Sequence, residues 1–287
     1  MASTTTFPPP PPLGESQAGH VPDQGPAKIH LWTAGTPNGY KVSVLLEELR
    51  DAYPEAAKNE LSYDVSKISI WENQQKHPDF LKINPNGRIP AIIDDNVTSV
   101  KGGFPVWESA SIELWLVEQY DKENKLWFAD PLLRAQALNW IFFAHGGVGP
   151  MQGQTHVFFR YAPIKIPFAI KRYHEETKRL YSVLEDGLKA GAGKWLVGDK
   201  YSVADINVFG WVRSAVWAGI DLADFPLLSA WADRIEKRPA VQRGISVPDA
   251  PKDLSSIKDE SVKDVNAWVD KANAELEEIK KQKEATA

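Results

Sequence analysis

The pattern of apolar and polar positions changes near Asp121, and this change divides the chain into two parts. Before it, short runs of strand character predict four strands, at residues 28–33, 61–68, 90–94 and 104–107. Apolar residues recur at helical spacing after the first run, up to Arg50, and after the fourth run, up to Tyr120. The order β-α-β followed by β-β-α predicts a compact α/β domain over residues 28–122.

After Asp121 the strand pattern stops, and apolar residues recur three and four positions apart. Helices are predicted from Asp130-Pro131 to Phe142, from Ile166 to Leu188, after Ser202, and from Leu227 to Lys237. We expect the glycines between His145 and Gly153 to kink or interrupt the first of these helices. Residues 130–248 are therefore predicted to form an all-helical domain.

Ser202 and Asp205 have the spacing of a helix capping box. In such a box the serine side chain binds a free amide of the first turn, while the carboxylate reaches back to the serine N–H. The pair therefore predicts the start of a helix and is not interpreted as a catalytic Ser/Asp pair.

Both ends of the chain differ from the predicted domains. Residues 1–27 contain a run of five prolines among small polar residues, which predicts a disordered tail, or alternatively a polyproline ligand for an aromatic groove. Residues 249–287 are charged, with a short apolar seam from Val262 to Ile279. This seam predicts a helix that packs on its own subunit or pairs with a partner helix.

Composition limits the classes of function. The chain has 287 residues, 43% of them apolar, and a net charge of −5, so nothing suggests a nucleic-acid partner. No apolar run approaches the roughly 20 residues that a spanning helix needs, and the first residues lack a signal-peptide layout, so we expect no membrane partner.

Cysteine is absent from the chain, and this restricts its possible chemistry. A disulfide framework, a thiolate metal site and a cysteine nucleophile are excluded, so any sulfur redox chemistry must use the thiol of a ligand. The six histidines have no zinc-type spacing, and we expect no metal. A cytoplasmic location is compatible with this composition and is our expectation.

The turn from Asn84 to Pro90 is the first candidate binding element. Proline has no amide proton and belongs at a strand start, where Pro90 lies. One interpretation is a cis Ile89-Pro90 bond that leaves the backbone of Ile89 free to pair with an extended ligand. The other is an ordinary Asn-Gly turn with a trans proline at a sheet edge.

Three motifs give the chain a resemblance to a known family. The Asn-Gly-Arg-Ile-Pro turn of 86–90, the Trp107-Glu108-Ser109 segment and the capping box of 201–206 resemble those of the cytosolic glutathione transferases. Further segments resemble the bacterial nu-class transferases and their fungal relatives, which include a prion-forming regulator of nitrogen repression. These segments lie at 36–42, 149–154 and 159–163.

The resemblance covers about residues 28–248 and implies a fold and a mode of action. It implies a thioredoxin-like N-terminal domain followed by an all-α domain, working as a homodimer with glutathione as co-substrate. Thr36 and Asn38 correspond to residues that donate hydrogen bonds to the glutathione sulfur, at a helix N-terminus that favours an anion. The simpler interpretation is that Thr36 or Asn38 only caps this helix.

The resemblance also implies how the rest of glutathione is held. Glu108 and Ser109 correspond to the pair that binds the γ-glutamyl end, although Ser109 alone would equally suit a helix cap. Ile89, with Pro90, corresponds to the residue whose backbone pairs with the cysteinyl unit. Two further residues are candidates for the glycine end, Gln75 and Arg88.

The second substrate is expected between the domains, where His156, Arg160 and Tyr161 are candidates to contact it. Arg160 and Tyr161 are equally compatible with surface positions over a helix bend. The reaction implied is either reduction of a disulfide or peroxide, or conjugation to a small electrophile in detoxification. Two alternatives stay open: a regulator that binds glutathione but acts on a protein partner, and a transferase dedicated to one biosynthetic pathway.

Overall fold

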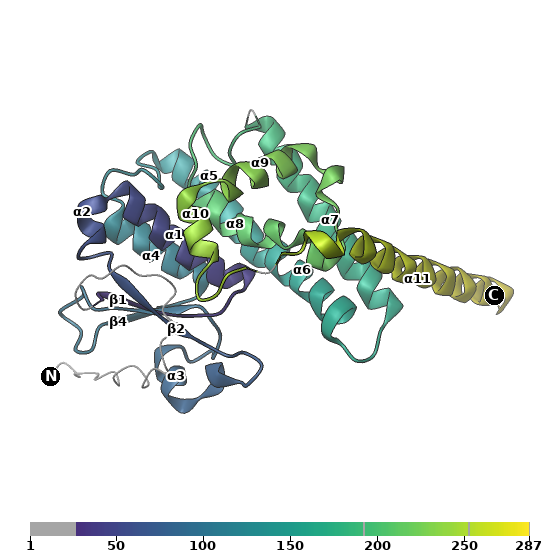
Figure 1. The fold of residues 1–287 in the computed structure, drawn as a ribbon. Coiled ribbons are helices and arrows are strands. Elements are labelled where there is room, and N and C mark those ends of the chain that lie inside the picture. Colours follow the sequence, from purple (N-terminus) through teal and green to yellow (C-terminus); the bar gives the residue numbers. More distant parts are fainter. Residues whose placement is uncertain (1–26, 192, 252, 287) are drawn as a thin grey trace.

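The computed structural model describes residues 27–191, 193–251 and 253–286. All but the last residue of the predicted proline-rich tail, 1–27, lies outside the described residues. Figure 1 shows a small sheet domain beside a larger group of helices, with the last helix running away from both.

The described residues form four strands and eleven α-helices. In chain order these are β1 (Ile29–Thr33), α1 (Pro37–Ala52), α2 (Pro54–Ala57), β2 (Tyr63–Lys67), α3 (Pro78–Ile83), β3 (Ala91–Asp94), β4 (Phe104–Trp107), α4 (Ser109–Tyr120), α5 (Pro131–Phe143), α6 (Gly149–His156), α7 (Pro167–Ala190), α8 (Val203–Arg213), α9 (Pro226–Glu236), α10 (Pro239–Ile245) and α11 (Lys258–Thr286). Short 3₁₀ turns lie at Gln74–Lys76, Ala215–Ala218, Leu222–Asp224 and Ser255–Ile257, and π-helical turns at Ala144–Val148 and Val157–Tyr161.

The sheet has the strand order β2-β1-β3-β4, with β1 and β2 parallel and the other pairs antiparallel. The parallel pair is joined through α1, as a β-α-β crossover requires. The predicted fold class is confirmed, a thioredoxin-like α/β domain followed by an all-helical domain. The short helices α2 and α3 were not predicted.

Both faces of the sheet are covered. Ile29 and Leu31 of β1 belong to the main core with the apolar side chains of α1 and α4. Trp32 lies on the opposite face, in a smaller cluster with Phe80 of α3 and Ile93 of β3. This second face of the sheet is therefore covered by α3.

The capping box predicted at the start of α8 is confirmed. The N–H of Ser202 donates to Asp205 Oδ2 over 3.0 Å, and the hydroxyl of Ser202 donates to the same oxygen over 3.2 Å. The second oxygen accepts from Trp231 Nε1 over 2.8 Å, and burial raises the pKa of Asp205 to about 6. The carboxylate thus joins α8 to α9 in the centre of the helical domain.

The glycine-rich segment between α5 and α6 interrupts the α-helix without breaking it. Ala144–Val148 forms a π-helical turn, and the backbone stays in the right-handed helical region through Gly149. The predicted interruption is confirmed, and its form is a widened turn. Pro239 follows the end of α9 and begins α10 at its first turn.

Helix α1 is held from both sides by the helical domain. A side chain at Gly210 of α8 would place its Cβ 2.5 Å from the carbonyl oxygen of Pro37, so only glycine allows this approach. Farther along α1, the hydroxyl of Ser43 donates to the carbonyl oxygen of Gly244 in α10 over 2.8 Å. The first turn of α1 is therefore fixed against the second domain.

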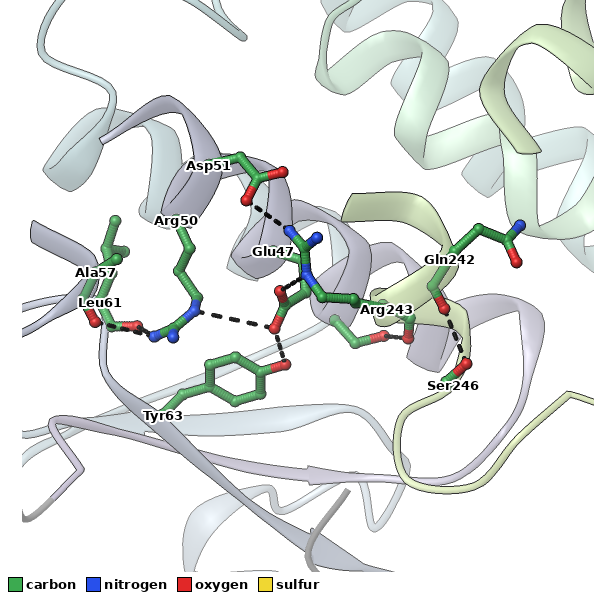
Figure 2. Close-up of polar contacts among 11 residues, drawn as sticks. Glu47, Arg50, Asp51, Ala57, Leu61, Tyr63, Gln242, Arg243 and Ser246 are labelled. Carbon is green, nitrogen blue, oxygen red and sulfur yellow. Dashed lines mark hydrogen bonds and ion pairs between the residues drawn. The ribbon is translucent and has the colours of Figure 1, made fainter. Parts of the chain in front are cut away.

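A polar network continues this contact along α1 (Figure 2). Arg243 of α10 donates to Glu47 over 2.7 Å and to Asp51 over 2.6 Å, and both carboxylates raise its pKa. Tyr63 of β2 donates to Glu47 over 2.7 Å, and burial raises the pKa of this phenol. Arg50 donates to the carbonyl oxygen of Leu61 over 2.8 Å. Strand β2, α1 and α10 are thus joined through one buried carboxylate.

The C-terminal helix α11 packs on its own subunit through its first half. Ser261, Val265 and Ala272 are buried, against α7 and the 3₁₀ turn at Ala215–Ala218. Leu276 and Ile279, farther along the predicted seam, are 38% and 48% exposed. The second half of α11 projects from the body, as Figure 1 shows.

The pair Glu48 and Arg238 provides a test of the interface between the domains. Arg238 donates two hydrogen bonds of 2.6 Å to the buried carboxylate of Glu48. Arg238→Met leaves this charge buried without its partner, and we expect the free energy of unfolding in urea to fall by about 3 kcal/mol. Replacing both residues with methionine should recover most of the loss.

The exposed pair Lys58 and Glu55 is a matched control. Lys58→Met should change the free energy of unfolding by less than about 0.5 kcal/mol. Equal effects of the two single substitutions would contradict the role given to the pair of Glu48 and Arg238.

Candidate functional site

The N-terminus of α1 has no acidic residue in its first turn, and its free backbone amides favour a negative charge nearby. Thr36 is its N-cap, and Thr36 Oγ1 accepts a hydrogen bond from the N–H of Gly39 over 3.1 Å. The capping role foreseen for Thr36 is therefore present. Among the described residues its hydroxyl proton has no acceptor, so this proton remains able to donate to a ligand.

Asn38 follows in the first turn, and Trp211 of α8 orients its amide. Trp211 Nε1 donates to Asn38 Oδ1 over 3.1 Å. Since the oxygen is engaged, the amide nitrogen with its two protons faces the other way. A tryptophan of the helical domain thus fixes a hydrogen-bond donor at the tip of α1.

A cleft of about 420 Å³ lies beside this tip, between the two domains. It is lined from α1 by Asn38 and Lys41, from the turn before β3 by Arg88, and from α8 by Trp211. The π-helical turn at Ala144–Val148 and helix α6 form the rest of its wall. Of the residues predicted for the site, Asn38 and Arg88 line the cleft.

The turn before β3 lies at the same end of the sheet as the N-terminus of α1. The Ile89–Pro90 peptide bond is cis. The backbone N–H and carbonyl of Ile89 make no hydrogen bond with other backbone groups of the described residues. Asn84 Nδ2 donates to the carbonyl oxygen of Arg88 over 2.7 Å and holds the turn. The turn therefore presents an unpaired backbone edge to an extended ligand.

Glu108 and Ser109 start α4 next to this turn. Asn86 Nδ2 donates to Glu108 Oε1 over 3.3 Å, which joins the two segments. Glu108 is the N-cap with φ 70°, a conformation that costs a residue with a side chain about 1–3 kcal/mol and is concentrated at functional sites. Ser109 is buried and is the first helical residue, so the cap expected at Ser109 lies at Glu108.

Gln75 lies in a 3₁₀ turn outside the cleft. Its Nε2 donates weakly to the carbonyl oxygen of Ile70 over 3.4 Å, and its Oε1 is buried without a partner. Arg88 is exposed and lines the cleft. Of these two candidates, only Arg88 lines the cleft.

The three residues predicted for the second substrate lie in different environments, and none lines the cleft. His156 is buried beside Trp211, with 6.0 Å between the ring centres, and burial lowers its pKa to about 4. Arg160 donates to the carbonyl oxygen of Trp217 over 3.0 Å and to Ser261 over 2.5 Å. Arg160 therefore holds α11 in place.

Tyr161 belongs to an exposed aromatic group that joins the domains. Its hydroxyl accepts from Trp217 Nε1 over 2.9 Å, and Trp71 of the α/β domain lies edge-on to its ring, with centres 5.7 Å apart. Trp71 is 77% exposed, so this group offers aromatic surface to a bound molecule.

A cluster of buried polar side chains at the floor of the cleft was not predicted. Lys41 is 1% exposed, and its Nζ donates to His145 Nε2 over 3.2 Å. Asn207 Nδ2 donates to Glu113 Oε2 over 2.5 Å. Burial lowers the pKa of Lys41 to about 8 and raises that of Glu113 to about 7. The available signal was a glutamate on the apolar face of α4, one residue after Ile112.

The described residues contain no group of three or more metal-ligating side chains that could hold a metal ion. Within the same residues, no helix is long and apolar enough to cross a membrane.

Comparison with known proteins decides the family. The family model of the glutathione S-transferase N-terminal domain matches residues 57–119, and that of the C-terminal domain matches residues 168–239. The disulfide-bond oxidoreductase YfcG of Escherichia coli (strain K12) is 40% identical over 219 residues, which are 76% of this chain and 94% of that protein. The chain belongs to the glutathione transferase family.

Fungal members of this family are also similar. Protein URE2 of Candida albicans is 32% identical over 246 residues, covering 73% of this chain and 67% of that protein. The crystal structure of a glutathione transferase homologue from Lodderomyces elongisporus, with two glutathione molecules per subunit, has 40% identity and a TM-score of 0.72. The match covers 78% of this chain and 100% of that chain.

The buried side chain of Glu113 leads to a prediction of how the stability of the protein depends on pH. Its pKa rises from 4.5 to about 7 on burial, so its contribution to stability is complete below pH 4.5 and is lost as pH rises through 7. Relative to Glu113→Gln, the wild-type free energy of unfolding should fall by on the order of 2 kcal/mol across this range. Urea denaturation at a series of pH values measures the difference.

Glu118→Gln, at an exposed position of the same helix, is the control and should give no such trend. A difference between wild type and Glu113→Gln that stays constant with pH would show that the Glu113 carboxylate titrates as it does in the unfolded chain.

Proposed function

We propose that this transferase reduces disulfides with glutathione as the electron donor. An ordinary thiol has a pKa near 8.5, and only the thiolate attacks a disulfide. The tip of α1 favours a negative charge, and Asn38 adds a donor beside it. The observation that carries the proposal is the hydrogen bond from Trp211 to Asn38, because it leaves the amide protons free for a sulfur.

The tripeptide is proposed to lie along the edge of the α/β domain. The unpaired backbone of Ile89, next to Pro90, would pair with the cysteinyl unit. Glu108 would pair with the ammonium group, and the free amide of Ser109 at the start of α4 would bind the γ-glutamyl carboxylate. Arg88, more than Gln75, would bind the glycine carboxylate.

A chain without cysteine needs two glutathione molecules for each disulfide. The first thiolate attacks the substrate, forms a mixed disulfide and releases one thiol. The second attacks the mixed disulfide, which forms glutathione disulfide and releases the other thiol. The two glutathione molecules in the Lodderomyces elongisporus structure support this stoichiometry. The similarity to YfcG supports disulfide reduction over conjugation to an electrophile in detoxification.

The protein is further proposed to be a cytoplasmic homodimer. The cytosol keeps glutathione reduced, as the reaction requires. Leu132 and Phe142 of α5 are 72% and 65% exposed, and a partner subunit would cover such side chains. Sedimentation should give twice the chain mass of 32.0 kDa, and a species of single chain mass at all concentrations would contradict the dimer.

The activity is tested with glutathione and bis(2-hydroxyethyl) disulfide, following glutathione disulfide with glutathione reductase. Asn38→Ala should lower kcat/KM by roughly tenfold or more, since a donor to the thiolate is lost. Thr36→Ala in the same chain should lower it further and also remove a helix cap worth about 1 kcal/mol.

Thr36→Ser is the control, because it keeps both the cap and the hydroxyl. Unchanged turnover in the Asn38→Ala, Thr36→Ala double variant, with the fold intact by circular dichroism, would place activation of the thiol elsewhere. No turnover by the wild type, together with glutathione binding in calorimetry, would favour the regulator that acts on a protein partner.

A further inference from the structure

Lys41 lies at the floor of the cleft, one helical turn after Asn38. Both residues line the cleft, and positions three apart on a helix are neighbours on one face. A sulfur held at Asn38 would therefore lie next to the ammonium group of Lys41. The residues around this group are polar, although the position is 1% exposed.

Few partners hold the ammonium group of Lys41. Within the part of the chain that the structure describes, its only hydrogen bond is to His145 Nε2, and it forms no ion pair. The nearby ionisable groups are Glu113 and Glu108 of the α4 region and His145 of the π turn at Ala144–Val148. The imidazole of His145 is neutral and accepts the hydrogen bond from Lys41. An ammonium group has three protons, so two remain for a group in the cleft.

The same neighbourhood contains other unsatisfied atoms. Glu113 Oε1 and Asn207 Oδ1 are buried without hydrogen-bond partners. A buried charge with so few partners lowers stability, and perturbed ionisable groups of this kind are concentrated at functional sites. The arrangement therefore points to a use for Lys41 beyond packing.

His145 orients Lys41 and does not itself exchange protons near neutral pH. Its Nε2 accepts from Lys41 over 3.2 Å and lies 3.4 Å from Asn207 Nδ2, so the ring proton is on Nδ1. Burial lowers the pKa of His145 to about 4, which keeps the ring neutral. The lone pair of Nε2 holds the ammonium group at the cleft floor.

We propose that Lys41 is the proton donor to the leaving thiolate when the enzyme reduces a disulfide. The inference rests on the proposed function. Glutathione thiolate attacks one sulfur of the substrate, a new sulfur–sulfur bond forms, and the old one breaks with its electron pair on the leaving sulfur. A proton passes from Lys41 Nζ to that sulfur and gives a thiol.

The neutral amine of Lys41 takes the proton of each glutathione thiol in turn, which produces the attacking thiolate, and the ammonium group gives that proton to the sulfur that leaves in the same exchange. Protons balance, because two glutathione thiols and one disulfide give glutathione disulfide and two thiols. Burial lowers the pKa of Lys41 to about 8, close to the 8.5 of an ordinary thiol, which suits proton transfer to the leaving sulfur.

The dependence on the leaving group tests this role. Lys41→Met should lower kcat/KM by roughly tenfold or more with bis(2-hydroxyethyl) disulfide, whose leaving thiol is weakly acidic. With an aryl disulfide that releases an acidic thiol, the rate should stay within about threefold, because such a thiolate leaves without a proton. Lys41→Arg keeps the positive charge, but a guanidinium group does not give up its proton, so this variant should show the same selective loss.

Equal losses with both disulfides, or no loss with either, would overturn the proposal. Failure of the wild type to reduce either disulfide would reject the proposed function itself, whereas full activity of Lys41→Met would reject only the role of Lys41.

A second measurement needs no variant and covers the case in which the Lys41 variants do not fold. In the wild type, kcat/KM across a series of disulfides should vary little with the acidity of the leaving thiol, because each leaving sulfur receives a proton. A rate that falls steeply as the leaving thiol becomes less acidic would contradict proton donation.

Discussion

The hydrogen bond from Trp211 Nε1 to Asn38 Oδ1 joins the two domains at the point where the chemistry is proposed. An asparagine at the first turn of a helix has two possible amide orientations, and only one presents protons to an anion. Because Trp211 engages the oxygen, the choice is made by the helical domain. The α/β domain thus supplies the N-terminus of α1, and the helical domain determines that the amide protons of Asn38, and not its oxygen, are available to an anion.

Close packing between α1 and the helical domain keeps this contact in register. Gly210 lets α8 reach the first turn of α1, and a Cβ at Gly149 would lie 3.1 Å from Trp211 Nε1. The ion pairs of Glu48 with Arg238 and of Glu47 with Arg243 hold the rest of α1. The interface between the domains is therefore part of the site. The contacts that stabilise this interface also fix the position of Asn38.

The sequence predicted the four strands, the helical second domain and the capping box of Ser202 and Asp205, because each depends on local spacing. It also named Asn38, through resemblance to a family, and Arg88, as a second candidate for the glycine carboxylate, and both residues line the cleft. It did not predict α3 or the role of Trp211, since these follow from contacts between distant segments. Arg160 is an instructive case, because its partner Ser261 is 101 residues away on a helix outside the family resemblance.

We propose that the N-terminus of α1 and Asn38 lower the pKa of a bound glutathione thiol. The most direct measurement is the ultraviolet absorbance of the thiolate in the complex, titrated with pH. In the wild type we expect the bound thiol to have a pKa at least about one unit below the 8.5 of an ordinary thiol, and in Asn38→Ala a return toward that value. A bound thiol that titrates near 8.5 in the wild type would show that the N-terminus of α1 and Asn38 do not activate it.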